Sequence, residues 1–567
     1  MRETLRLKSA PQTAEDEIKF LLDEVKRGTL DAAGAVKALD LSRLNEILHP
    51  RINAPGATCN EVSRAEGLPK WTGGISGAPG AAAGRVYFSA DALLEAKALA
   101  RQRGEDTRCI LVLPAAFAGD VKAIKAAAGV LTAQGGYAAH ASVVARQYGT
   151  VSLVAPELSI TDKTAVLGGL SFSEGDPITL DVPGFGIPSV YQGIAEISEP
   201  DITGSALLDF ITLAKGLIKN FQIRVNAETP EDAEKALSLG AEGIGLCRTE
   251  HMFFKPERIN PFRELILSES GEARNKALEK LREMQCDDFY RIFKIMAGKH
   301  VTIRLLDAPL HEFMPRSDAD LASYMDHISA SKETALSGDE VLARIETLRE
   351  YNPMLGRRGC RIAVSYPEIY AMQVRAIVEA VHKMHDEKLD VQPEIMVPLV
   401  MNAAELKLIA YGKRAEGASY AGIAGVEEFL NCPIGAMIEL PAAALGAGDI
   451  ARYAQFFSFG TNDLTQTTLG LSRDDAAGFL PAYSHYDLLE GNPFSVLDER
   501  VKELIALAVD RGRLTRPDLV CGLCGEQGAD PAAIRFCIDT GINYVSCSPY
   551  AVPAAIVAAA QILAEKK

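Results

Sequence analysis

The sequence has no long apolar run and few cysteines, and both absences narrow the class of protein. None of its apolar segments reaches the roughly 18 to 20 residues that a membrane-spanning helix needs. The first residues, 1–8, lack the apolar core of a signal peptide, which argues against export. Ten cysteines scattered over 567 residues do not have the spacing of a disulfide framework. We therefore expect a cytoplasmic protein with reduced thiols.

A basic cluster is also absent. The formal net charge is −16, which makes the chain a poor candidate for nucleic-acid binding. An anionic small substrate remains compatible with this charge, because a site needs only a few arginines or a metal ion. The chain contains no Gly-x-x-x-x-Gly-Lys-Ser/Thr loop either, so a nucleotide site of that kind is not expected.

Length and periodicity predict several domains. Residues 1–71 read as a helical lead-in. Residues 72–198 alternate short strands with two or three helices and predict a compact β/α domain. Residues 199–220 predict a helical linker, which either lets its two neighbours move or packs and fixes them.

From 221 to 567, strands alternate with amphipathic helices, which predicts a (β/α)₈ barrel with insertions. The insertion at 250–300 reads as helical. A ninth strand candidate means that one of the nine is auxiliary. The candidates are 222–227, 243–248, 301–307, 360–364, 394–399, 436–440, 457–460, 519–523 and, as the ninth, 544–547.

The segment 135–146 lies between an apolar strand candidate and a helical run that stops at Gly149. This order places His140 at or near a helix N-terminus, where free N–H groups and the positive end of the helix dipole favour a phosphoryl group. The same positive end disfavours imidazolium, so the ring stays neutral and nucleophilic. The alternative is a histidine that only caps the turn.

Polar side chains gather at the predicted carboxyl ends of the barrel strands, where barrel enzymes have their active sites. Arginines there suit a multiply charged anion, while separated carboxylates with an amide suit a hard cation such as Mg²⁺. Taken singly, each arginine is as readily a structural partner of a carboxylate, but their shared position favours a site for a phosphorylated carboxylate. These residues are Arg248, Glu250, Arg304, Asp307, Arg357, Arg358, Glu439, Asn462, Asp463, Cys524 and Glu526.

The segment 135–146 resembles the phosphohistidine motif of phosphoenolpyruvate (PEP)-utilising enzymes. Further segments resemble the same family, most closely its pyruvate, phosphate dikinase branch, and the resemblance runs from about residue 25 to the C-terminus. Those segments are 240–254, 305–315, 352–361, 457–466 and 544–549.

The resemblance implies a swivelling β/β/α phosphohistidine domain followed by a C-terminal (β/α)₈ TIM barrel. It also implies a phosphotransferase that interconverts PEP and pyruvate. His140 would carry the phosphoryl group, and Arg304 and Arg358 would hold the phosphate of PEP. Cys524 would protonate the enolate of pyruvate at carbon 3, or remove that proton in reverse.

The resemblance further implies the cofactor and the partners. Glu439 and Asp463 would bind Mg²⁺, and groups of Gly460, Thr461 and Asn462 would orient the substrate carboxylate. A homodimer through the barrel is implied as well. Dikinases carry an ATP-grasp nucleotide domain before the region matched here, so we expect a separate chain to supply the nucleotide chemistry.

Beside the histidine the sequence departs from the family pattern. The family usually has Thr two residues before the histidine, followed by Ser or Cys, whereas this chain has Ala138 and Ala139. A hydroxyl that contacts the phosphoryl group, or is itself phosphorylated by a regulator, is thus missing. The change bears on transfer rate and on regulation rather than on the nucleophile.

Three alternatives stay open. An Enzyme I-like transfer to a protein ranks second, because His140 lies only 140 − 77 = 63 positions after Gly77, too few for that enzyme's helical insertion. A non-catalytic PEP-binding regulator has no need of the whole residue set. Cys521 and Cys524 also fit a redox or metal pair, although no second pair accompanies them.

Overall fold

The structure, a computed structural model, describes most of the chain. The described residues are 13–52, 67–116, 120–135, 140–183, 187–200, 202, 204–268, 271–315, 318–331, 337–415, 418–426, 432–473 and 498–566, with individual positions between 476 and 497. Among them, no helix has both the length and the apolar character needed to cross a membrane.

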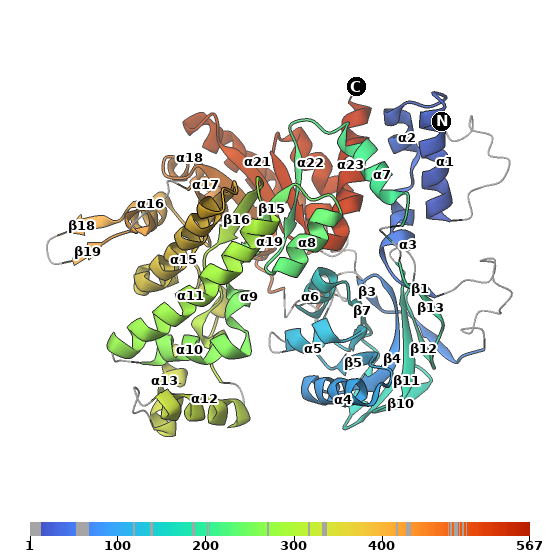
Figure 1. Cartoon of the computed structure of the whole chain (residues 1–567), viewed down its shortest axis with the longest axis horizontal. Helices are drawn as coiled ribbons and strands as arrows, with labels where there is room; N and C mark the ends of the chain where they lie inside the picture. Colours follow the sequence, from blue (N-terminus) through green and yellow to red (C-terminus); the bar gives the residue numbers. More distant parts are fainter. Residues whose placement is uncertain are drawn as a thin grey trace.

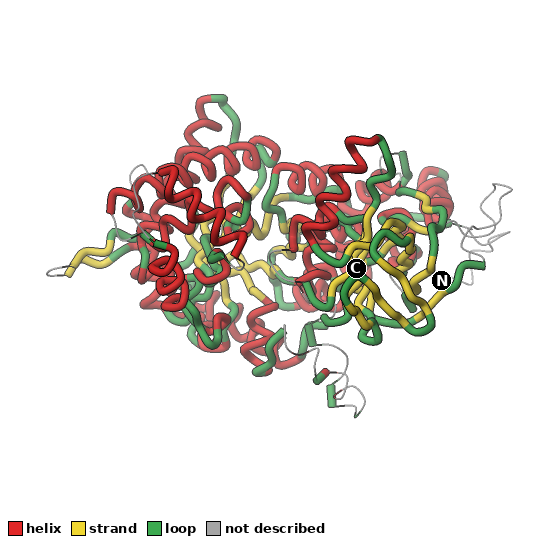
Figure 2. The backbone as a smooth tube through the Cα atoms, turned by 90° about the horizontal axis from the view of Figure 1, so that it is seen from below, coloured by secondary structure: helices red, strands yellow, loops and turns green. Residues whose placement is uncertain are grey.

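Two groups of strands organise the molecule. Figure 2 shows one group surrounded by helices and a second group beside it, toward the N-terminus. The first is a closed, parallel, eight-stranded barrel, and the second contains an eight-stranded mixed sheet. We call the second part the sheet domain, defined by strands β2 to β12. The expected combination of a β/α domain with a (β/α)₈ barrel is confirmed.

The barrel strands follow one another around the barrel in chain order, each hydrogen-bonded in parallel to the next, and β23 closes the ring on β14. They are β14 (Gln222–Asn226), β15 (Gly243–Arg248), β16 (His300–Arg304), β17 (Gln392–Val397), β20 (Ile434–Ile438), β21 (Phe456–Gly460), β22 (Val520–Cys524) and β23 (Tyr544–Cys547).

One predicted barrel strand is wrong. Residues 360–364 belong to helix α14 (Cys360–Ser365), and the ninth candidate, β23, is the eighth strand. A short, mostly apolar segment does not by itself distinguish a strand from a helix. Here Cys360, Ile362 and Ala363 are buried while Val364 is exposed, which is a helical rather than an alternating pattern.

Helices cover the outside of the barrel (Figure 1), and the insertion predicted at 250–300 is helical. The barrel helices are α8 (Pro230–Ser238), α9 (Glu250–Phe253), α10 (Pro256–Leu267), α11 (Gly271–Ile295), α12 (Asp318–Ser331), α13 (Gly338–Leu348), α15 (Pro367–Asp386), α16 (Ala403–Tyr411), α17 (Pro441–Leu445), α18 (Ala447–Ile450), α19 (Thr461–Leu469), α21 (Glu499–Thr515), α22 (Pro531–Asp539) and α23 (Val552–Glu565). A hairpin, β18 (Lys413–Ala415) with β19 (Ala418–Tyr420), projects at the left of Figure 1.

The sheet domain has a core on each face of its sheet. Along β5, alternate residues enter opposite cores, as the period of a strand requires. Helices α4 (Ala90–Arg103), α5 (Val121–Ala126) and α6 (His140–Tyr148) contribute to one core, and the strands β8 (Ser159–Thr161), β9 (Thr164–Leu167) and β10 (Leu170–Ser173) to the other. The sheet strands are β2 (Lys70–Thr72), β3 (Ile75–Ala78), β4 (Gly80–Tyr87), β5 (Cys109–Leu113), β6 (Gly129–Thr132), β7 (Val151–Val154), β11 (Pro177–Val182) and β12 (Ser189–Gln192).

The lead-in helices pack on the barrel rather than on the sheet domain. Helices α1 (Ala14–Lys26), α2 (Ala32–Ala38) and α7 (Leu207–Lys215) share one hydrophobic core with the barrel helix α23 (Figure 1). The side-chain amide of Gln561 in α23 donates to the carbonyl oxygens of Val36 (2.8 Å) and Leu39 (2.9 Å). Helix α7, the predicted linker, is therefore a packed helix, and the domain boundaries given above stay predictions.

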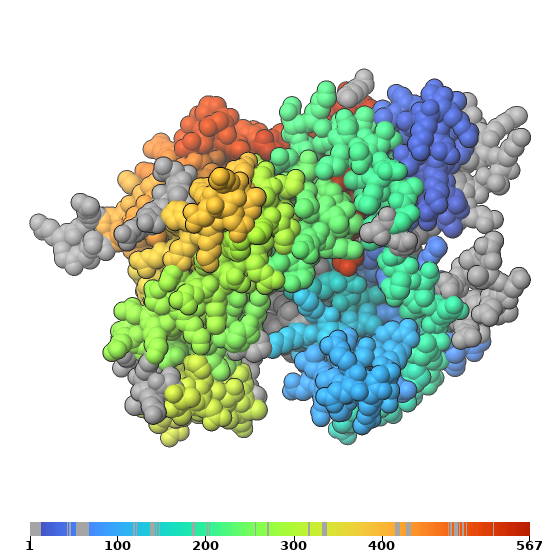
Figure 3. Space-filling model, viewed as in Figure 1, coloured from blue at the N-terminus to red at the C-terminus, as the bar shows by residue number. Residues whose placement is uncertain are grey.

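Two paired strands connect the parts. After α3 (Asn45–Leu48), the chain leaves through β1 (Arg51–Ile52) and returns through β13 (Ile197–Ser198). These two strands pair antiparallel, Arg51 opposite Ser198 and Ile52 opposite Ile197. Figure 3 shows the sheet domain, in blue, against the green part of the barrel, with a notch between it and the α12–α13 region.

Candidate active site

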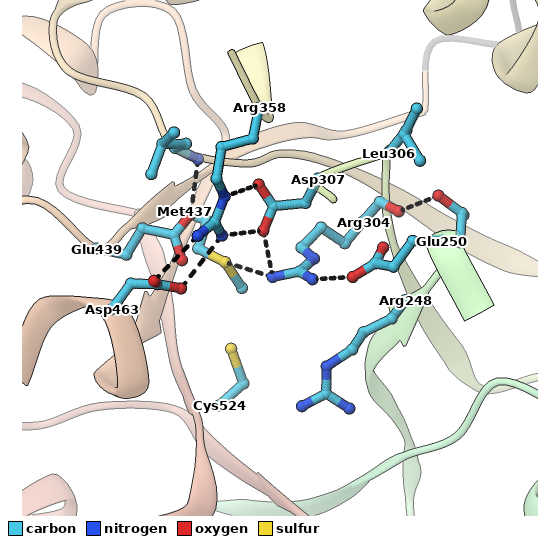
Figure 4. A network of polar contacts seen from close by, with 12 residues as sticks. Arg248, Glu250, Arg304, Leu306, Asp307, Arg358, Met437, Glu439, Asp463 and Cys524 are labelled. Atoms are coloured by element: carbon cyan, nitrogen blue, oxygen red, sulfur yellow. Dashed lines mark hydrogen bonds and ion pairs between the residues drawn. The ribbon is translucent and has the colours of Figure 1, made fainter. Parts of the chain in front are cut away.

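A chain of buried ion pairs lies at the carboxyl end of the barrel (Figure 4). Arg304, the last residue of β16, lies 2.9 Å from Asp307 through its Nη1. Arg358 also contacts Asp307, at 2.6 Å and 3.1 Å, and it reaches Asp463 at 3.2 Å. Two arginines thus converge on one carboxylate, which is the arrangement that recognises a multiply charged anion.

The electrostatics of this chain follow from burial and pairing. Burial alone would raise the pKa of Asp307, but Arg358 and Arg304 outweigh it and lower that pKa. Burial would likewise lower the pKa of Arg304, yet Glu250 and Asp307 raise it above its ordinary value. Glu250 is the second ion-pair partner of Arg304. Both arginines are therefore permanently charged.

Glu439 lies directly after β20 and is buried. Among the described residues its carboxylate accepts a hydrogen bond from the backbone N–H of Leu399 (2.6 Å) but forms no ion pair. Burial, together with Asp307 and Asp463, raises its pKa well above the ordinary value. A carboxylate held in this way favours the arrival of a cation.

The backbone that holds Glu439 is strained. Leu399 has φ = 54°, a left-handed conformation that is uncommon for a residue with a side chain. Cys360 fixes this turn, because its N–H donates to the carbonyl oxygen of Pro398 (3.1 Å) and its thiol to that of Leu399 (3.0 Å). Gly460 leaves room for the carboxylate, since a Cβ there would lie 2.6 Å from Oε2 of Glu439.

Helix α19 begins at this end of the barrel, immediately after β21. Its first turn contains Thr461, Asn462 and Asp463, so backbone N–H groups at a helix N-terminus face the site end of the barrel. The hydroxyl of Thr461 donates to Oε1 of Gln527 (2.6 Å). Thr461 therefore offers its N–H to a ligand, because its hydroxyl is already engaged.

The Cys524 thiol ends β22 beside Ser458, with Sγ and Oγ 3.0 Å apart. Burial raises the pKa of this thiol to about 11, although the Ser458 hydrogen bond opposes the shift. The thiol is thus protonated at neutral pH. Cys521 lies three residues earlier on the same strand, so its side chain points to the opposite side of the strand from that of Cys524. The two thiols belong to different hydrophobic clusters, which argues against a redox pair.

The nine cysteines that the structure describes are buried, free thiols. No disulfide joins any two of these nine, and the expectation of reduced thiols stays a prediction.

His140 opens helix α6 in the sheet domain, as the sequence predicted. Ala138 and Ala139 lie outside the described residues, and so does the side chain of His140. Its role as the phosphoryl carrier stays a prediction.

The structure brings most of the predicted barrel residues together and separates others. Arg357 is exposed, and its backbone N–H donates to Oε1 of Glu350 (2.7 Å). Arg248 pairs with Glu228 (2.9 Å) rather than with Glu250, and it projects into the space near Cys524 (Figure 4). Leu399, Gln527 and Ser458 were missed, because each contributes a contact that only the folded barrel creates.

A (β/α)₈ barrel with convergent arginines and carboxylates at its carboxyl end, joined to a separate domain in which a histidine opens a helix, defines a class of two-part α/β proteins whose barrel end suits a charged substrate. Family comparison narrows this class. Residues 209–564 match the family described as PEP-utilising enzyme, PEP-binding domain, and residues 105–183 match PEP-utilising enzyme, mobile domain. The chain belongs to the PEP-utilising enzymes.

Relatives of this chain are named pyruvate, phosphate dikinase. The protein of Treponema pallidum (strain Nichols) is 56% identical over 553 residues, which cover 96% of this chain and 60% of the relative. The protein of Clostridium symbiosum is 43% identical over 99% of this chain and 62% of its own length. That of Rhizobium meliloti (strain 1021) is 44% identical over 98% and 59%. The chain thus spans about 60% of the length of these relatives.

Proposed function

We propose that this protein is a Mg²⁺-dependent phosphotransferase that interconverts PEP and pyruvate through a phosphohistidine at His140. The observation that carries the proposal is the convergence of three buried side chains, Arg304, Arg358 and Glu439, with the half-buried Asp463 at one end of the barrel. Membership in the PEP-utilising enzymes and the names of the relatives support it.

The arginines would bind the phosphate of PEP. In the structure, Arg358 bridges Asp307 and Asp463, so these carboxylates occupy the guanidinium groups that a phosphate would take. An arriving phosphate would compete with Asp463 for Arg358. Asp463 would then be available to a metal ion, while Asp307 would keep both arginines in position.

Glu439 and Asp463 fit Mg²⁺. Glu439 has no ion pair among the described residues, and burial with Asp307 and Asp463 raises its pKa although Arg358 and Arg304 oppose the shift. A cation bound directly to this carboxylate would offset the cost of its burial. The described residues contain no ready-made group of three metal-binding side chains, which agrees with an ion that keeps waters and takes substrate oxygens. When bound, the ion would neutralise charge on the phosphate and on the enolate oxygen.

The chain's own residues account for the bonds that change. The His140 nitrogen attacks phosphorus, and the bond between phosphorus and the enol oxygen breaks with its electron pair on that oxygen. Arg304 and Arg358 stabilise the charge on the transferring group. Cys524, protonated at neutral pH, gives its proton to carbon 3 of the enolate and completes pyruvate.

The N-terminus of α19 would orient the substrate carboxylate. Gly460, Thr461 and Asn462 lie where the strand turns into the helix. Free N–H groups there suit an anion, so they would fix the reacting end of PEP relative to Cys524.

The test is a half-reaction with PEP labelled on phosphorus. Mg²⁺ and the full chain should give acid-labile label on the protein and an equal amount of pyruvate. His140→Ala should abolish the label, whereas His385→Ala, on the exposed end of α15, should not change it. PEP that binds without labelling the wild type would overturn the proposal in favour of a regulatory role.

Transfer from the labelled protein decides the next partner. A separate ATP-grasp chain stays a prediction, supported if adding one removes the label in a nucleotide-dependent step. Loss of label to an added phosphocarrier protein would instead favour the Enzyme I-like alternative. A homodimer through the barrel also stays a prediction, which light scattering on the purified chain tests.

A further inference from the structure

The helix that His140 opens ends against the barrel. Helix α6 runs to Tyr148, and Gly149 follows it with φ = 70°. A Cβ on Gly149 would lie 2.6 Å and 2.7 Å from ring carbons of Tyr550. Tyr550 belongs to the short η8 helix (Pro549–Ala551) that follows β23, at the carboxyl end of the barrel. The backbone of the sheet domain thus touches an aromatic ring of the barrel with no room for a side chain.

Other groups hold this ring in place. The Nζ of Lys235, in α8, lies 5.3 Å from the centre of the Tyr550 ring, and the His49 ring lies 6.0 Å away. His49 precedes Pro50, whose carbonyl oxygen accepts from the N–H of Ala81 in β4 (2.7 Å). The ring therefore stands between the barrel, the connecting strand and the sheet domain.

The contact lies beside the candidate active site. Burial raises the pKa of Tyr148, and the barrel carboxylates Glu228 and Asp232 raise it further, which places the end of α6 near them. Glu228 is the partner of Arg248, the arginine that projects toward Cys524. Lys125 of α5 lies 4.6 Å from the centre of the Tyr148 ring and adds a cation to the same boundary.

Helix geometry gives this contact a consequence for His140. Eight residues, each with a rise of 1.5 Å, separate the first residue of α6 from the last. The backbone of His140 therefore lies about 12 Å from that of Tyr148 along the helix axis. The covalent connections β1 and β13 are two residues long each and do not by themselves fix the angle of that helix. Non-covalent contacts also set that angle, and the contact at the far end of α6 is one of them.

We propose that the Tyr550 ring is a docking seat for Gly149, and that this seat positions His140 for phosphoryl transfer at the barrel site. Tyr550 and Gly149 are positioning residues and do not touch the reacting atoms. The inference rests on the proposed function, because it assigns the contact to the transfer step.

Gly149→Ala tests the seat, and the chain supplies a matched control. Gly104 ends α4 in the same domain with φ = 65°, and a Cβ there would meet nothing within 4 Å. Gly104→Ala therefore carries the same backbone strain without the overlap. We expect Gly149→Ala to slow single-turnover label transfer from PEP at least tenfold and Gly104→Ala to leave it within twofold.

Two readouts separate docking from folding and from the reaction itself. The affinity for PEP should stay within twofold in both variants, because the barrel is unchanged. Hydroxyl-radical footprinting should show greater modification of Tyr148 and Tyr550 in Gly149→Ala than in the wild type. Tyr550→Ala should slow transfer to a similar degree, and the double variant should be no slower than either single variant.

The outcomes are distinguishable. Slower transfer with unchanged PEP affinity and greater tyrosine modification supports the seat. Unchanged transfer in Gly149→Ala overturns the inference, whatever the footprint. If the wild type binds PEP but is not labelled, the proposed function is overturned. If, in addition, Tyr148 and Tyr550 are modified equally in Gly149→Ala and in the wild type, the contact between Gly149 and Tyr550 is not formed in solution.

Discussion

Two buried glutamates inside one barrel have opposite electrostatic surroundings. Glu394, on β17, lies 2.9 Å from Arg224, 2.8 Å from His300 and 2.6 Å from the Thr302 hydroxyl. Burial would raise its pKa, but these neighbours lower it to about 2. The carboxylate of Glu439, at the other end of the strands, accepts one hydrogen bond among the described residues, from the backbone N–H of Leu399, and its pKa is raised.

The difference distinguishes a glutamate that holds barrel strands together from the glutamate that we propose binds a cation. Arg224 stacks over the Tyr544 ring at 4.0 Å and reaches Glu394 across the barrel, so this layer ties β14, β17 and β23 together. Glu439 is instead held beside two other carboxylates, by a strained turn, in a state that a cation would relieve. Such an arrangement is costly for the fold and useful for binding.

Replacing Glu439 should give the largest effect. Glu439→Gln keeps the shape but weakens the metal site, so label transfer should fall by roughly a thousandfold. The midpoint of thermal unfolding should stay the same or rise, because a buried charge is removed. Mg²⁺ should raise the midpoint of the wild type but not of the variant. A lower midpoint without Mg²⁺ would place Glu439 among the structural residues.

Replacing Glu394 should lower the stability of the fold and leave PEP binding unchanged. Glu394→Gln leaves Arg224 buried without a carboxylate, so the free energy of unfolding should fall by about 3 kcal/mol. The affinity for PEP should not change. Glu387→Gln, which breaks the exposed pair with Lys294, is the control and should not move the urea midpoint. A loss of PEP affinity in Glu394→Gln would mean that the two ends of the barrel are coupled.

Glu394 should also make the free energy of unfolding depend on pH. Its folded pKa of about 2 lies below the ordinary value of 4.5, so its contribution is complete above pH 4.5 and is lost as the pH falls toward 2. The difference in unfolding free energy between wild type and Glu394→Gln should therefore shrink as the pH falls from 4.5 toward 2. Urea titrations at several pH values measure it. A difference independent of pH would contradict the assignment.

Gly460→Ala should give the smallest effect. Its Cβ would displace the carboxylate of Glu439, so about tenfold more Mg²⁺ should be needed for half-maximal label transfer. Gly425→Ala, where the nearest atom to a Cβ lies at 3.7 Å, is the control. An unchanged Mg²⁺ requirement in Gly460→Ala would show that this glycine does not support the metal site.

The sequence was sufficient for features that depend on local order. Strand, glycine turn and helix placed His140 at the start of α6, and residues at strand ends met because parallel strands end on one rim of a barrel. Residues 360–364 were predicted as a strand but form a helix. Which of their side chains are buried depends on the neighbouring elements that pack on them, and the local sequence does not show this. The Arg224–Glu394 layer was not found, because partners 170 residues apart give no local signal.

The paired strands β1 and β13 bring the two ends of the sheet domain close together in space. Neighbouring strands lie about 5 Å apart, so the segments that enter and leave this domain are adjacent to each other. Cutting out residues 53–196 would leave two ends that a short turn could join, with α1, α2 and α7 still packed on α23. Because the barrel strands all come after residue 221, removing or exchanging the sheet domain would leave the order of these strands unchanged.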